Sequence, residues 1–556
     1  MHVLSAAEMQ ACDRATTERF GIPSIQLMRT ASSAVAAFAR QQFPRARRVT
    51  VLCGKGNNGG DGMMAARLLA DAGLEVTTLL FGAPEQLTGD AATAWSELNS
   101  LKHGPIHRVR VHVVTNARTL AEHNEALNTD LIVDAVLGTG FKPPLKGLAL
   151  DALEWMERAR AQNPAPILAP ILAIDLPSGW PADETSATVA GPVFPADAVI
   201  TFTAPKLAHV FGQLTRRWDQ PVVVAPIGSP DAAIVSALKI DWAGSSLALA
   251  QAPRAASANK GNFGHVLVVG GTFGTSGGKA GAPAMTALAA MRTGAGLVTA
   301  AVPAPALQVV ASFAPELMTW PLLATRKGQI AAKNLEKKQI AELIAGKSVL
   351  ALGPGLGQGA EVAKFVAGLL GATKIPAVVD ADALNILAAK PALIKKSAKG
   401  RTLVLTPHPG EMARLLGVTV TEVQAGRLET ARDFAQRMGV TLVLKGARTL
   451  IAHPDGRVAV NTSGNPGMAK GGSGDLLTGM IAGLLAQYPH ETAQAVEAAV
   501  YLHGLAADLA VRDGDEHTLL PTDSLAQLAR AFQSRAHDFD EDGKNGYVWL
   551  QGHSMQ

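Results

Sequence analysis

The alternation of short aliphatic runs with helical stretches is the feature that most constrains the fold of this chain. It predicts parallel strands joined by crossover helices. In the first half the aliphatic runs lie at 49–53, 76–81, 131–136 and 171–175, and helical stretches include 31–43 and 62–72. A second series of runs follows at 265–270, 349–353, 377–380, 403–406 and 441–445. The pattern therefore predicts two α/β units in series.

The length of the chain agrees with this division. Its 556 residues exceed one ordinary domain, since domains usually hold about 100–200 residues. Between residues 229 and 255 the pattern gives way to Gly, Pro, Ser and Ala, with one short helix expected at 230–238. We therefore predict a linker at 229–255, between a first domain at 1–228 and a second at 256–535. The acidic segment 536–556 is expected to be a disordered tail.

Composition excludes several classes of protein. Hydrophobic residues make up 48% of the chain but aromatic residues only 4%, so the cores must be aliphatic and rich in alanine. A net charge of +4, without a basic cluster interleaved with aromatics, argues against nucleic acid as a partner. Two cysteines cannot build a disulfide framework or a zinc site. No apolar run reaches the roughly 18 residues that span a bilayer, so we expect a cytoplasmic protein with no membrane partner.

A glycine-rich loop at 464–475, Gly-Asn-Pro-Gly-Met-Ala-Lys-Gly-Gly-Ser-Gly-Asp, precedes the apolar run 476–485. Unpaired amides at a helix start attract phosphate oxygens, and glycine lets the backbone approach closely. The charge of Asp475 would compete with a phosphate there. We therefore interpret Asp475 as a base that takes a proton from a hydroxyl beside the transferred group. The alternative is a flexible turn with an Asp in the first helical turn.

In the first half, residues 54–62 contain G-x-G-x-x-G between a predicted strand and a helix, with Glu75 about twenty residues later. This dinucleotide pattern is weak alone, but the turn also carries polar side chains that it does not need. Ligands of parallel sheets bind outside the carboxyl ends of strands. Several polar side chains would converge on one crevice there: Asn58, Asp61, Asp134, Asp175 and Ser178. The alternative is that each Asp only caps the turn that follows it.

In order and over nearly the whole chain, these motifs resemble those of the bifunctional NAD(P)H-hydrate repair enzymes. In that family an NAD(P)HX epimerase domain precedes an ADP- or ATP-dependent NAD(P)HX dehydratase domain of the ribokinase-like superfamily. The matching segments are 57–62, 134, 138–140, 175–179 and 204–206, then 259–261, 294–296, 353–357, 408–411, 445–449 and 472–475. The resemblance implies an N-terminal Rossmann-like three-layer α/β/α domain followed by a ribokinase-like α/β domain.

The implied substrates are NADHX and NADPHX, reduced cofactors with water added so that a hydroxyl lies on C6, in R and S forms. By resemblance, Asp175 lies at the reacting carbon and would shuttle the proton as the hydroxyl leaves or the ring opens. The implied binding residues are Asn57, Asn58, Gly59, Gly60, Asp61, Gly138, Thr139, Gly140, Phe141, Lys142, Pro143, Pro144 and Asp175. Asn58, Asp134 and Ser178 resemble the family's potassium ligands, and a hard cation prefers such oxygens.

The second half would phosphorylate the C6 hydroxyl, because hydroxide is a poor leaving group near neutral pH. ADP, with ATP possible, is the implied donor and would end as AMP and phosphate, with Mg²⁺ expected beside it. The resemblance implies a nucleotide site at Lys445, Gly446, Ala447, Arg448, Thr449 and Gly474. It implies a hydrate pocket at Gly296, Gly357, His408 and Asp475. For His408, a loop residue between two prolines is the alternative to direct chemistry.

Arg29 and Ser32 depart from the family pattern in the first helix, near the implied homo-oligomer contact and the entrance to the epimerase pocket. Two other hypotheses remain open. One is a true ribokinase-like small-molecule kinase with a nucleotide-binding N-terminal domain. The other is a first half that only binds and does not catalyse, which the presence of Asp175 beside Asn58 and Asp134 disfavours.

Overall fold

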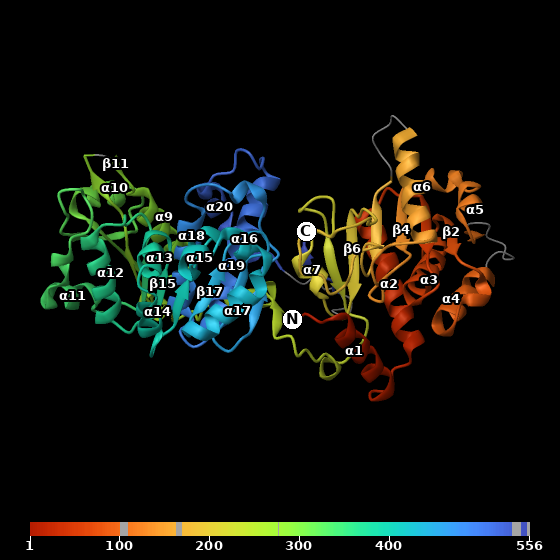
Figure 1. The fold of residues 1–556 in the computed structure, drawn as a ribbon, viewed down its shortest axis with the longest axis horizontal. Coiled ribbons are helices and arrows are strands. Elements are labelled where there is room, and N and C mark those ends of the chain that lie inside the picture. The colour runs from red at the N-terminus through yellow and green to blue at the C-terminus, as the bar shows by residue number, and fades with distance from the viewer. Residues whose placement is uncertain (101–108, 163–168, 276, 536–545, 553–556) are drawn as a thin grey trace. The chain divides into compact units, whose positions relative to one another are not determined.

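A computed structural model describes residues 1–100, 109–162, 169–275, 277–535 and 546–552. The chain divides into two compact units (Figure 1), and each is described by itself. The first contains Met1–Ile240 with Arg535–Gln556, and the second contains Asp241–Ser534. The division falls inside the segment predicted to be a linker.

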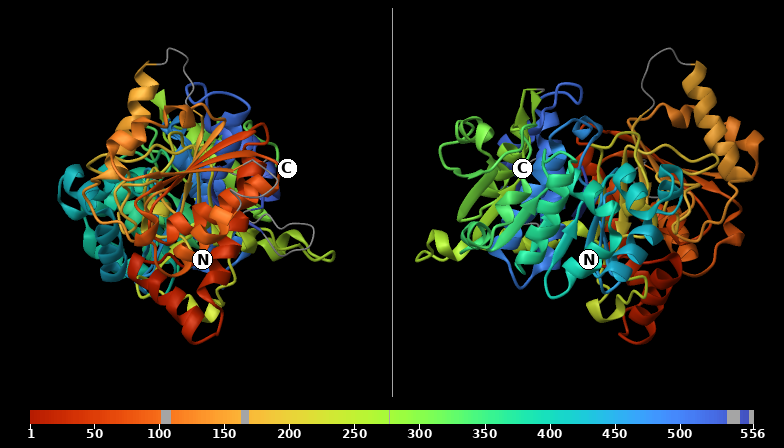
Figure 2. Two further views of the ribbon diagram at one scale, coloured as in Figure 1. Left: turned by 90° about the vertical axis from the view of Figure 1, so that its right-hand side faces the viewer. Right: turned by 60° about the vertical axis from the view of Figure 1, so that its left-hand side comes forward.

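The first unit is built on an eight-stranded sheet in the order β20-β7-β6-β5-β4-β1-β2-β3. Its strands are β1 (Arg48–Cys53), β2 (Glu75–Phe81), β3 (Val109–Val114), β4 (Leu131–Ala135), β5 (Ile171–Ile174), β6 (Ala198–Phe202), β7 (Val222–Ala225) and β20 (Val548–Gln551). Only β20 is antiparallel to its neighbour. The strands fan out with the usual twist of a parallel sheet (Figure 2, left).

The helices of this unit are α1 (Ala6–Glu18), α2 (Ser24–Gln42), α3 (Asn57–Asp71), α4 (Gly89–Ser100), α5 (Ala117–Ala121), α6 (Leu148–Gln162) and α7 (Leu207–Phe211). Neighbouring residues of one strand face different helical layers. Val51 belongs to a buried cluster with α2, α3 and α4, whereas Leu52 belongs to a cluster with α6. This alternation gives the three-layer α/β/α arrangement that the resemblance implies.

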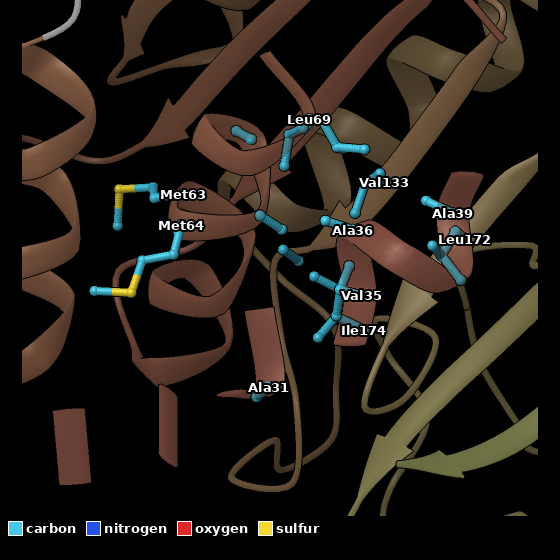
Figure 3. Packing of buried hydrophobic residues seen from close by; sticks show 14 of the residues in the cluster. Ala31, Val35, Ala36, Ala39, Met63, Met64, Leu69, Val133, Leu172 and Ile174 are labelled. Carbon is cyan, nitrogen blue, oxygen red and sulfur yellow. The ribbon is translucent and has the colours of Figure 1, made fainter. Parts of the chain in front are cut away.

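One helical layer shows how small residues set the spacing of these layers. Figure 3 shows Val35 and Ala36 of α2 close to Val133 of β4 and Ile174 of β5. Alanine at such positions lets a helix approach the sheet closely. The alanine-rich core expected from composition is therefore observed in this unit.

The end of the chain corrects the prediction of a disordered tail at 536–556. Residues 536–545 and 553–556 lie outside the described residues, but Val548–Gln551 forms β20 on β7. Trp549 is 1% exposed and its ring lies 6.0 Å from that of Phe38. The hydroxyl of Tyr547 donates to the Ala34 carbonyl at 2.9 Å. The prediction rested on the acidic composition of 536–556 and overlooked the apolar run Tyr547-Val-Trp-Leu, which pairs with β7 at the edge of the sheet.

The segment 229–255 is also more structured than a linker. It contains short 3-10 turns at Asp231–Ala233 and Ala243–Ser246, strand β8 (Ile240–Trp242) and helix α8 (Leu247–Ala250). The helix expected at 230–238 is only one 3-10 turn. The Ser236 hydroxyl donates to the Val3 carbonyl and accepts from the Leu238 amide, so it competes with helical hydrogen bonding.

The second unit is built on a ten-stranded sheet in the order β13-β12-β9-β14-β15-β16-β17-β18-β19-β8. Its further strands are β9 (His265–Val269), β12 (Leu297–Pro303), β13 (Met318–Leu322), β14 (Val349–Leu352), β15 (Ala377–Val379), β16 (Leu403–Leu405), β17 (Thr441–Leu444), β18 (Leu450–Ala452) and β19 (Val458–Val460). The pairs from β13 to β17 are parallel, and β18 then runs antiparallel to both of its neighbours. A two-stranded hairpin, β10 (Phe273–Gly274) and β11 (Gly277–Gly278), stands apart from this sheet.

The further helices of this unit are α9 (Gly281–Arg292), α10 (Leu307–Ala311), α11 (Lys337–Ile344), α12 (Ala360–Ala372), α13 (Ala381–Ala388), α14 (Pro391–Ala398), α15 (Pro409–Leu416), α16 (Val420–Ala425), α17 (Arg427–Met438), α18 (Ser473–Gln487), α19 (Thr492–Arg512), α20 (Pro521–Ala526) and α21 (Leu528–Gln533). Helix α18 follows the glycine-rich loop and packs along α9 and over the central strands. A Cβ atom at Gly479 of α18 would lie 2.1 Å from the Thr286 carbonyl oxygen of α9. Glycine is therefore needed where these two helices touch.

Candidate functional site

The carboxyl ends of β1, β4 and β5 meet around one cavity in the first unit, because these strands are neighbours in a parallel sheet. The cavity has a volume of about 610 Å³. Eight of the predicted residues line it: Asn57, Asn58, Asp61, Gly138, Thr139, Gly140, Phe141 and Asp175. The convergence expected from the strand ends is therefore observed.

Five other residues predicted to bind the hydrate do not line this cavity among the described residues. Lys142, Pro143 and Pro144 follow Phe141 in the loop after β4 and do not line the cavity in the described part of the unit. Gly59 and Gly60 are buried in the first turns of α3. A Cβ atom at Gly59 would lie 1.9 Å from the Gly54 carbonyl oxygen, and one at Gly60 would lie 2.6 Å from Cε of Met28. The backbone contact requires glycine at position 59, whereas at position 60 the nearest atom is the end of the flexible Met28 side chain.

Asp175 lies directly after β5 with φ +64°, a left-handed conformation that is uncommon for a residue other than glycine. Its side chain is 9% exposed. Oδ1 is 3.0 Å from Nζ of Lys206 and accepts a hydrogen bond from the Thr201 hydroxyl at 2.9 Å. Oδ2 accepts from the Thr139 amide at 2.8 Å and from the Thr139 hydroxyl. Every one of these contacts favours the carboxylate form.

The protonation of Asp175 follows from these contacts. Burial alone would raise the pKa of the carboxyl, but the charges of Lys206 and His209 and the hydrogen bond from Thr139 outweigh it. They hold the pKa of Asp175 below its usual range. Asp175 is therefore expected to be a carboxylate at neutral pH.

The two departures in α2 have simple structural roles. The hydroxyl of Ser32 is buried and donates to the Met28 carbonyl at 2.8 Å and to the Asp61 carbonyl at 3.1 Å. Arg29 lies on the surface and pairs with Glu97 at 2.8 Å. Ser32 thus ties α2 to the helix that carries Asp61.

The three predicted potassium ligands occupy two neighbouring strand ends and the start of α3. The Ser178 hydroxyl donates to Oδ1 of Asp134 at 2.6 Å, and the Ser178 amide donates to Oδ2 at 2.8 Å. Burial raises the pKa of Asp134 to about 6. Among the described residues, neither the oxygen nor the nitrogen of the buried Asn58 amide has a hydrogen-bond partner. An amide oxygen without a hydrogen-bond partner and a buried carboxyl are both groups that a hard cation binds.

In the second unit, a cavity of about 360 Å³ lies at the start of α18. It is lined by Lys279, Ala282, Met285, Gly355, Ala381, Asp382, Asn385, Glu411 and Asp475. The glycine-rich loop enters α18 through Gly472, whose φ of +100° suits glycine. Asp475 is in the first turn of this helix and lines the cavity, so the cavity lies beside the start of the helix.

Burial and the nearby Asp380 carboxylate, opposed only in part by the Lys445 charge, raise the pKa of Asp475 to about 7. A carboxyl with such a pKa takes up a proton more readily than an ordinary Asp. This property suits a general base near neutral pH.

A partly buried ion pair, Asp380 with Lys445, lies beside the start of α18. Oδ1 of Asp380 is 2.9 Å from Nζ of Lys445, and Oδ2 accepts from the Thr478 hydroxyl at 2.9 Å. A Cβ atom at Gly474 would lie 3.3 Å from the same Lys445 nitrogen and 3.4 Å from Oδ2 of Asp380. Two of the predicted nucleotide residues, Lys445 and Gly474, are therefore neighbours.

The remaining nucleotide residues, 446–449, form the turn between β17 and β18. Arg427 donates from one guanidinium nitrogen to the Ala447 carbonyl at 2.5 Å, and the Thr449 hydroxyl donates to the Gly446 carbonyl at 2.9 Å. Arg448 has φ +54° and donates to the Thr462 carbonyl at 3.0 Å. The turn is thus held by one side chain from outside it, Arg427, and by two of its own, Arg448 and Thr449.

Asp382 connects the cavity to Gly357. Its Oδ2 accepts from the Gly357 amide at 2.8 Å and lies 3.2 Å from Nζ of Lys279. Burial opposes ionisation of Asp382, but the hydrogen bonds from Gln358 and Gly357 lower its pKa overall. Gly357 therefore reaches the cavity through Asp382 and does not line it.

His408 and Gly296 also lie outside the lining among the described residues. Nδ1 of His408 accepts from the Gly410 amide at 3.0 Å and caps α15, and its own amide donates to Oε2 of Glu411 at 2.9 Å. Burial and the Lys445 charge lower the pKa of His408, so its ring is neutral. A Cβ atom at Gly296 would lie 1.7 Å from the Lys260 carbonyl oxygen, which explains that glycine by packing.

Sequence reasoning missed Lys206, Asp382 and Lys279 as site residues. Asp382 follows β15 in the stretch Asp380-Ala-Asp-Ala-Leu-Asn385, so two acids and an amide directly after a strand were a usable signal. Lys206 lies in the matching segment 204–206, but the resemblance gave it no role and no strand pattern pointed to it. It comes from the segment after β6, and only the fold brings it to Asp175.

Within the described ranges, three or more His, Cys, Asp or Glu side chains nowhere gather closely enough to hold a metal ion. None of the helices described combines the length and low polarity that crossing a lipid bilayer demands.

Comparison with known proteins identifies the family of both units. The family described as "NAD(P)H-hydrate dehydratase" matches residues 266–530, and that described as "YjeF-related protein N-terminus" matches residues 24–208. Relatives named "Bifunctional NAD(P)H-hydrate repair enzyme Nnr" are similar over nearly their whole length. The protein of Moorella thermoacetica is 39% identical over 94% of this chain and 95% of its own. That of Coxiella burnetii is 36% identical over 91% and 95%, and that of Escherichia coli is 35% identical over 97% and 95%.

Solved structures resemble parts of the chain. An ADP/ATP-dependent NAD(P)H-hydrate dehydratase from Bacillus subtilis, co-crystallised with ATP/Mg²⁺, is 33% identical, covers 52% of this chain and 96% of its own, and has a TM-score of 0.44. A ribokinase-like superfamily protein from Enterococcus faecalis is 27% identical, covers 54% and 97%, and has a TM-score of 0.45.

The relatives match both units in the same order and over nearly the full length of the chain. The protein therefore belongs to the family of bifunctional NAD(P)H-hydrate repair enzymes, with an N-terminal epimerase unit and a C-terminal dehydratase unit.

Proposed function

We propose that this chain restores NADHX and NADPHX to the reduced cofactors in two steps. The first unit interconverts the R and S forms at C6, and the second dehydrates the S form at the expense of ADP or ATP. The observation that supports this most directly is the position of Asp475, in the first turn of a helix that a glycine-rich loop opens, on the wall of a cavity. In this position Asp475 can act as a base on the hydroxyl while the start of the same helix binds the phosphate that is transferred.

For the epimerase step, we assign Asp175 to the reacting carbon. The loop at 138–141 and the start of α3 hold the hydrate around it. Because Asp175 is ionised, its negative charge stabilises positive charge that develops at C6 and the ring nitrogen as the hydroxyl leaves. Gly59, Gly60, Lys142, Pro143 and Pro144 stay assigned to the hydrate by resemblance, through their backbone or at the rim.

Asn58, Asp134 and Ser178 are assigned to a potassium ion. The unsatisfied Asn58 amide and the buried Asp134 carboxyl fit such an ion. When bound, the cation would offset the charge of Asp134 and order the loops that carry Asn58 and Ser178.

For the dehydratase step, Asp475 accepts the proton of the C6 hydroxyl as that oxygen attacks the terminal phosphate of the nucleotide. The amides at 471–474 stabilise the charge that develops on the transferred phosphoryl group. Lys445, Gly446, Ala447, Arg448, Thr449 and Gly474 hold the nucleotide. The phosphorylated oxygen then leaves C6 as phosphate, a far better leaving group than hydroxide, and C5 gives up a proton to solvent so that the C5–C6 double bond forms again. AMP remains when ADP is the donor.

Magnesium is proposed with the nucleotide. This ion commonly needs only one or two protein carboxylates in addition to substrate phosphates and water, so the absence of a three-ligand cluster in the described ranges does not oppose it. Of the carboxyls lining the cavity, Asp382 is engaged by Lys279 and Gly357 and Asp475 serves as base. Oε2 of Glu411 accepts from the His408 amide, so Oε1 of Glu411 is assigned to hold the ion, which would neutralise phosphate charge.

One assay tests the whole proposal. Purified protein is incubated with mixed R- and S-NADHX, ADP and Mg²⁺, and the rise of reduced-nicotinamide absorbance is followed. Complete conversion supports both activities. Conversion of the S portion alone, with R lost only at its spontaneous rate, means that the first unit only binds. No conversion supports the alternative of a small-molecule kinase. A homo-oligomer is proposed by resemblance alone and is measured by light scattering.

A further inference from the structure

The epimerase cavity holds more carboxyl groups than cations. Its wall carries four carboxyls, Asp13, Asp61, Asp90 and Asp175, and two ammonium groups, Lys55 and Lys206. The Lys206 ammonium is bound to Asp175 and to the Thr201 hydroxyl at 2.7 Å. The Lys55 ammonium is exposed and donates to Gln86 at 3.1 Å. Within the part of the chain that the structure describes, no hydrogen bond or ion pair reaches the Asp61 carboxyl.

Asp61 and Asp175 are therefore driven toward opposite protonation states. Burial raises the pKa of Asp61 well above its usual value, and the charges of Asp175, Asp13 and Asp90 raise it further. Asp175 instead collects a cation and three hydrogen bonds from hydroxyls and an amide. In many active sites, one of two carboxyls has a raised pKa and serves as the acid, while the other has a low pKa and stays ionised.

We propose that the Asp61 carboxyl is the acid of the epimerase reaction and protonates the departing C6 hydroxyl, while ionised Asp175 stabilises the positive charge on the ring. This assignment rests on the proposed function of the first unit. It gives Asp61 a catalytic role in addition to binding, and it moves the proton away from Asp175.

The step balances without any further reagent. The C6–O bond breaks with its electron pair going to oxygen, the Asp61 proton joins that oxygen, and water is formed. The lone pair of the ring nitrogen N1 fills the vacancy as a C6–N1 double bond, which leaves a planar iminium cation beside Asp175. Water then adds to either face of C6, its proton returns to Asp61, and the opposite epimer results when the other face is used.

Asp13 is the competing proton donor. It lies on α1, also lines the cavity, and burial raises its pKa, although the Lys206 charge lowers it. Asp13 is more accessible to solvent than Asp61, which is partly buried in the first turns of α3. Asp61 is also tied to α2 through the Ser32 hydrogen bond to its carbonyl. The more enclosed and better fixed group is the stronger candidate.

The test uses the full-length protein with purified R-NADHX, ADP and Mg²⁺, under conditions in which epimerisation limits the rise of absorbance. For Asp61→Asn we expect kcat of epimerisation to fall about 100-fold or more, with KM changed by less than about 3-fold. Asp61→Glu should recover part of the rate. Asp71→Asn, an exposed change at the far end of the same helix, should keep it. Dehydration of purified S-NADHX by every variant shows that the chain is folded.

The pH profile separates a chemical role from a structural one. With an acid that must be protonated, kcat of wild-type epimerisation falls as pH rises, after subtraction of the spontaneous rate. Asp61→Asn should lack this decline. The assignment is overturned if Asp61→Asn keeps a kcat near that of wild type, if its alkaline decline persists, or if Asp13→Asn takes the large loss instead. A wild-type protein that dehydrates S-NADHX but leaves R-NADHX at its spontaneous rate overturns the proposed epimerase itself, a different result.

Discussion

Nζ of Lys206 lies 3.0 Å from Oδ1 of Asp175, and the two side chains are 2% and 9% exposed. Lys206 comes from the segment after β6 and Asp175 from the end of β5, so neighbouring strands of the sheet bring them together. The pair keeps a carboxylate ionised in the interior, at a backbone position with positive φ. Activity and stability of the first unit therefore depend on the same contact.

Replacement of Asp175 by Asn should separate the two activities of the chain. Epimerisation should fall by about 100-fold or more because the negative charge opposite the developing cation is lost. Dehydration of S-NADHX should stay within about twofold of wild type, since Asp475 lies in the other unit. The measurement follows R-NADHX and S-NADHX separately by chromatography. Equilibration of R and S by this variant at the wild-type rate would show that the role assigned to Asp175 is wrong.

The same substitution should destabilise the first unit. It leaves the Lys206 ammonium buried without a counter-charge, and breaking a buried ion pair in this way costs about 3–5 kcal/mol. Because the pKa of Asp175 is held low, its contribution to stability is present above the unfolded pKa near 4 and is lost as pH falls below it. Thermal unfolding should thus show a smaller difference between wild type and variant at pH 3 than at pH 7. Asp175→Asn with Lys206→Met should recover part of the loss, and no recovery in this double variant would contradict the pairing.

Dehydration should depend on the ionisation of Asp475. A base must be deprotonated to act, and the pKa of Asp475 is raised to about 7, so kcat for S-NADHX should fall as pH drops below about 7. Asp475→Asn should lose about 100-fold or more of kcat at pH 8 while epimerisation continues. A rate that is constant between pH 5 and pH 8 would exclude this carboxyl as the base. Asp523→Asn, on an exposed turn of α20, is a matched control.

Potassium should stimulate epimerisation. We expect a higher rate in K⁺ than in an organic cation of equal ionic strength, and Ser178→Ala should raise the half-saturating K⁺ concentration about 10-fold or more. The titration is done at constant ionic strength with R-NADHX as substrate. Thr185→Ala, at an exposed position a few residues later, should leave the response unchanged. An identical K⁺ response in Ser178→Ala and wild type would exclude the proposed ligand set.

The C-terminal strand should be essential for the first unit. Trp549→Ala removes a side chain that is 1% exposed and packs against Phe38, so we expect a loss of about 3–5 kcal/mol of unfolding free energy. The measurement is denaturant unfolding followed by circular dichroism, with epimerase activity as a second readout. Val113→Ala, at a 36% exposed position on the opposite edge strand β3, should cost much less. Equal stability of the two variants would contradict the packing of β20.

Local pattern determined the fold class and most strand positions. The runs predicted at 49–53, 131–136 and 441–445 appear as β1, β4 and β17 with ends shifted by only one residue. A buried parallel strand is a continuous aliphatic run, and a helix start with glycine is a local signal, so both can be recognised without knowing the contacts. The convergence of Asn58, Asp61 and Asp175 also followed from sequence, because carboxyl ends of neighbouring parallel strands meet at one edge.

Only the tertiary structure decided which groups face one another. Lys206 and Asp175 are 31 positions apart in the sequence, and Phe38 and Trp549 are 511 apart. Asp382 contacts Gly357, 25 positions away, and Lys279, 103 positions away. The tertiary structure also decided the protonation states of the carboxyl groups in the two sites. Asp61, Asp175 and Asp475 are the same residue type, and their pKa values diverge because burial and neighbouring charges differ at each place. Residue type sets which chemistry is available, and the folded environment sets which protonation state performs it.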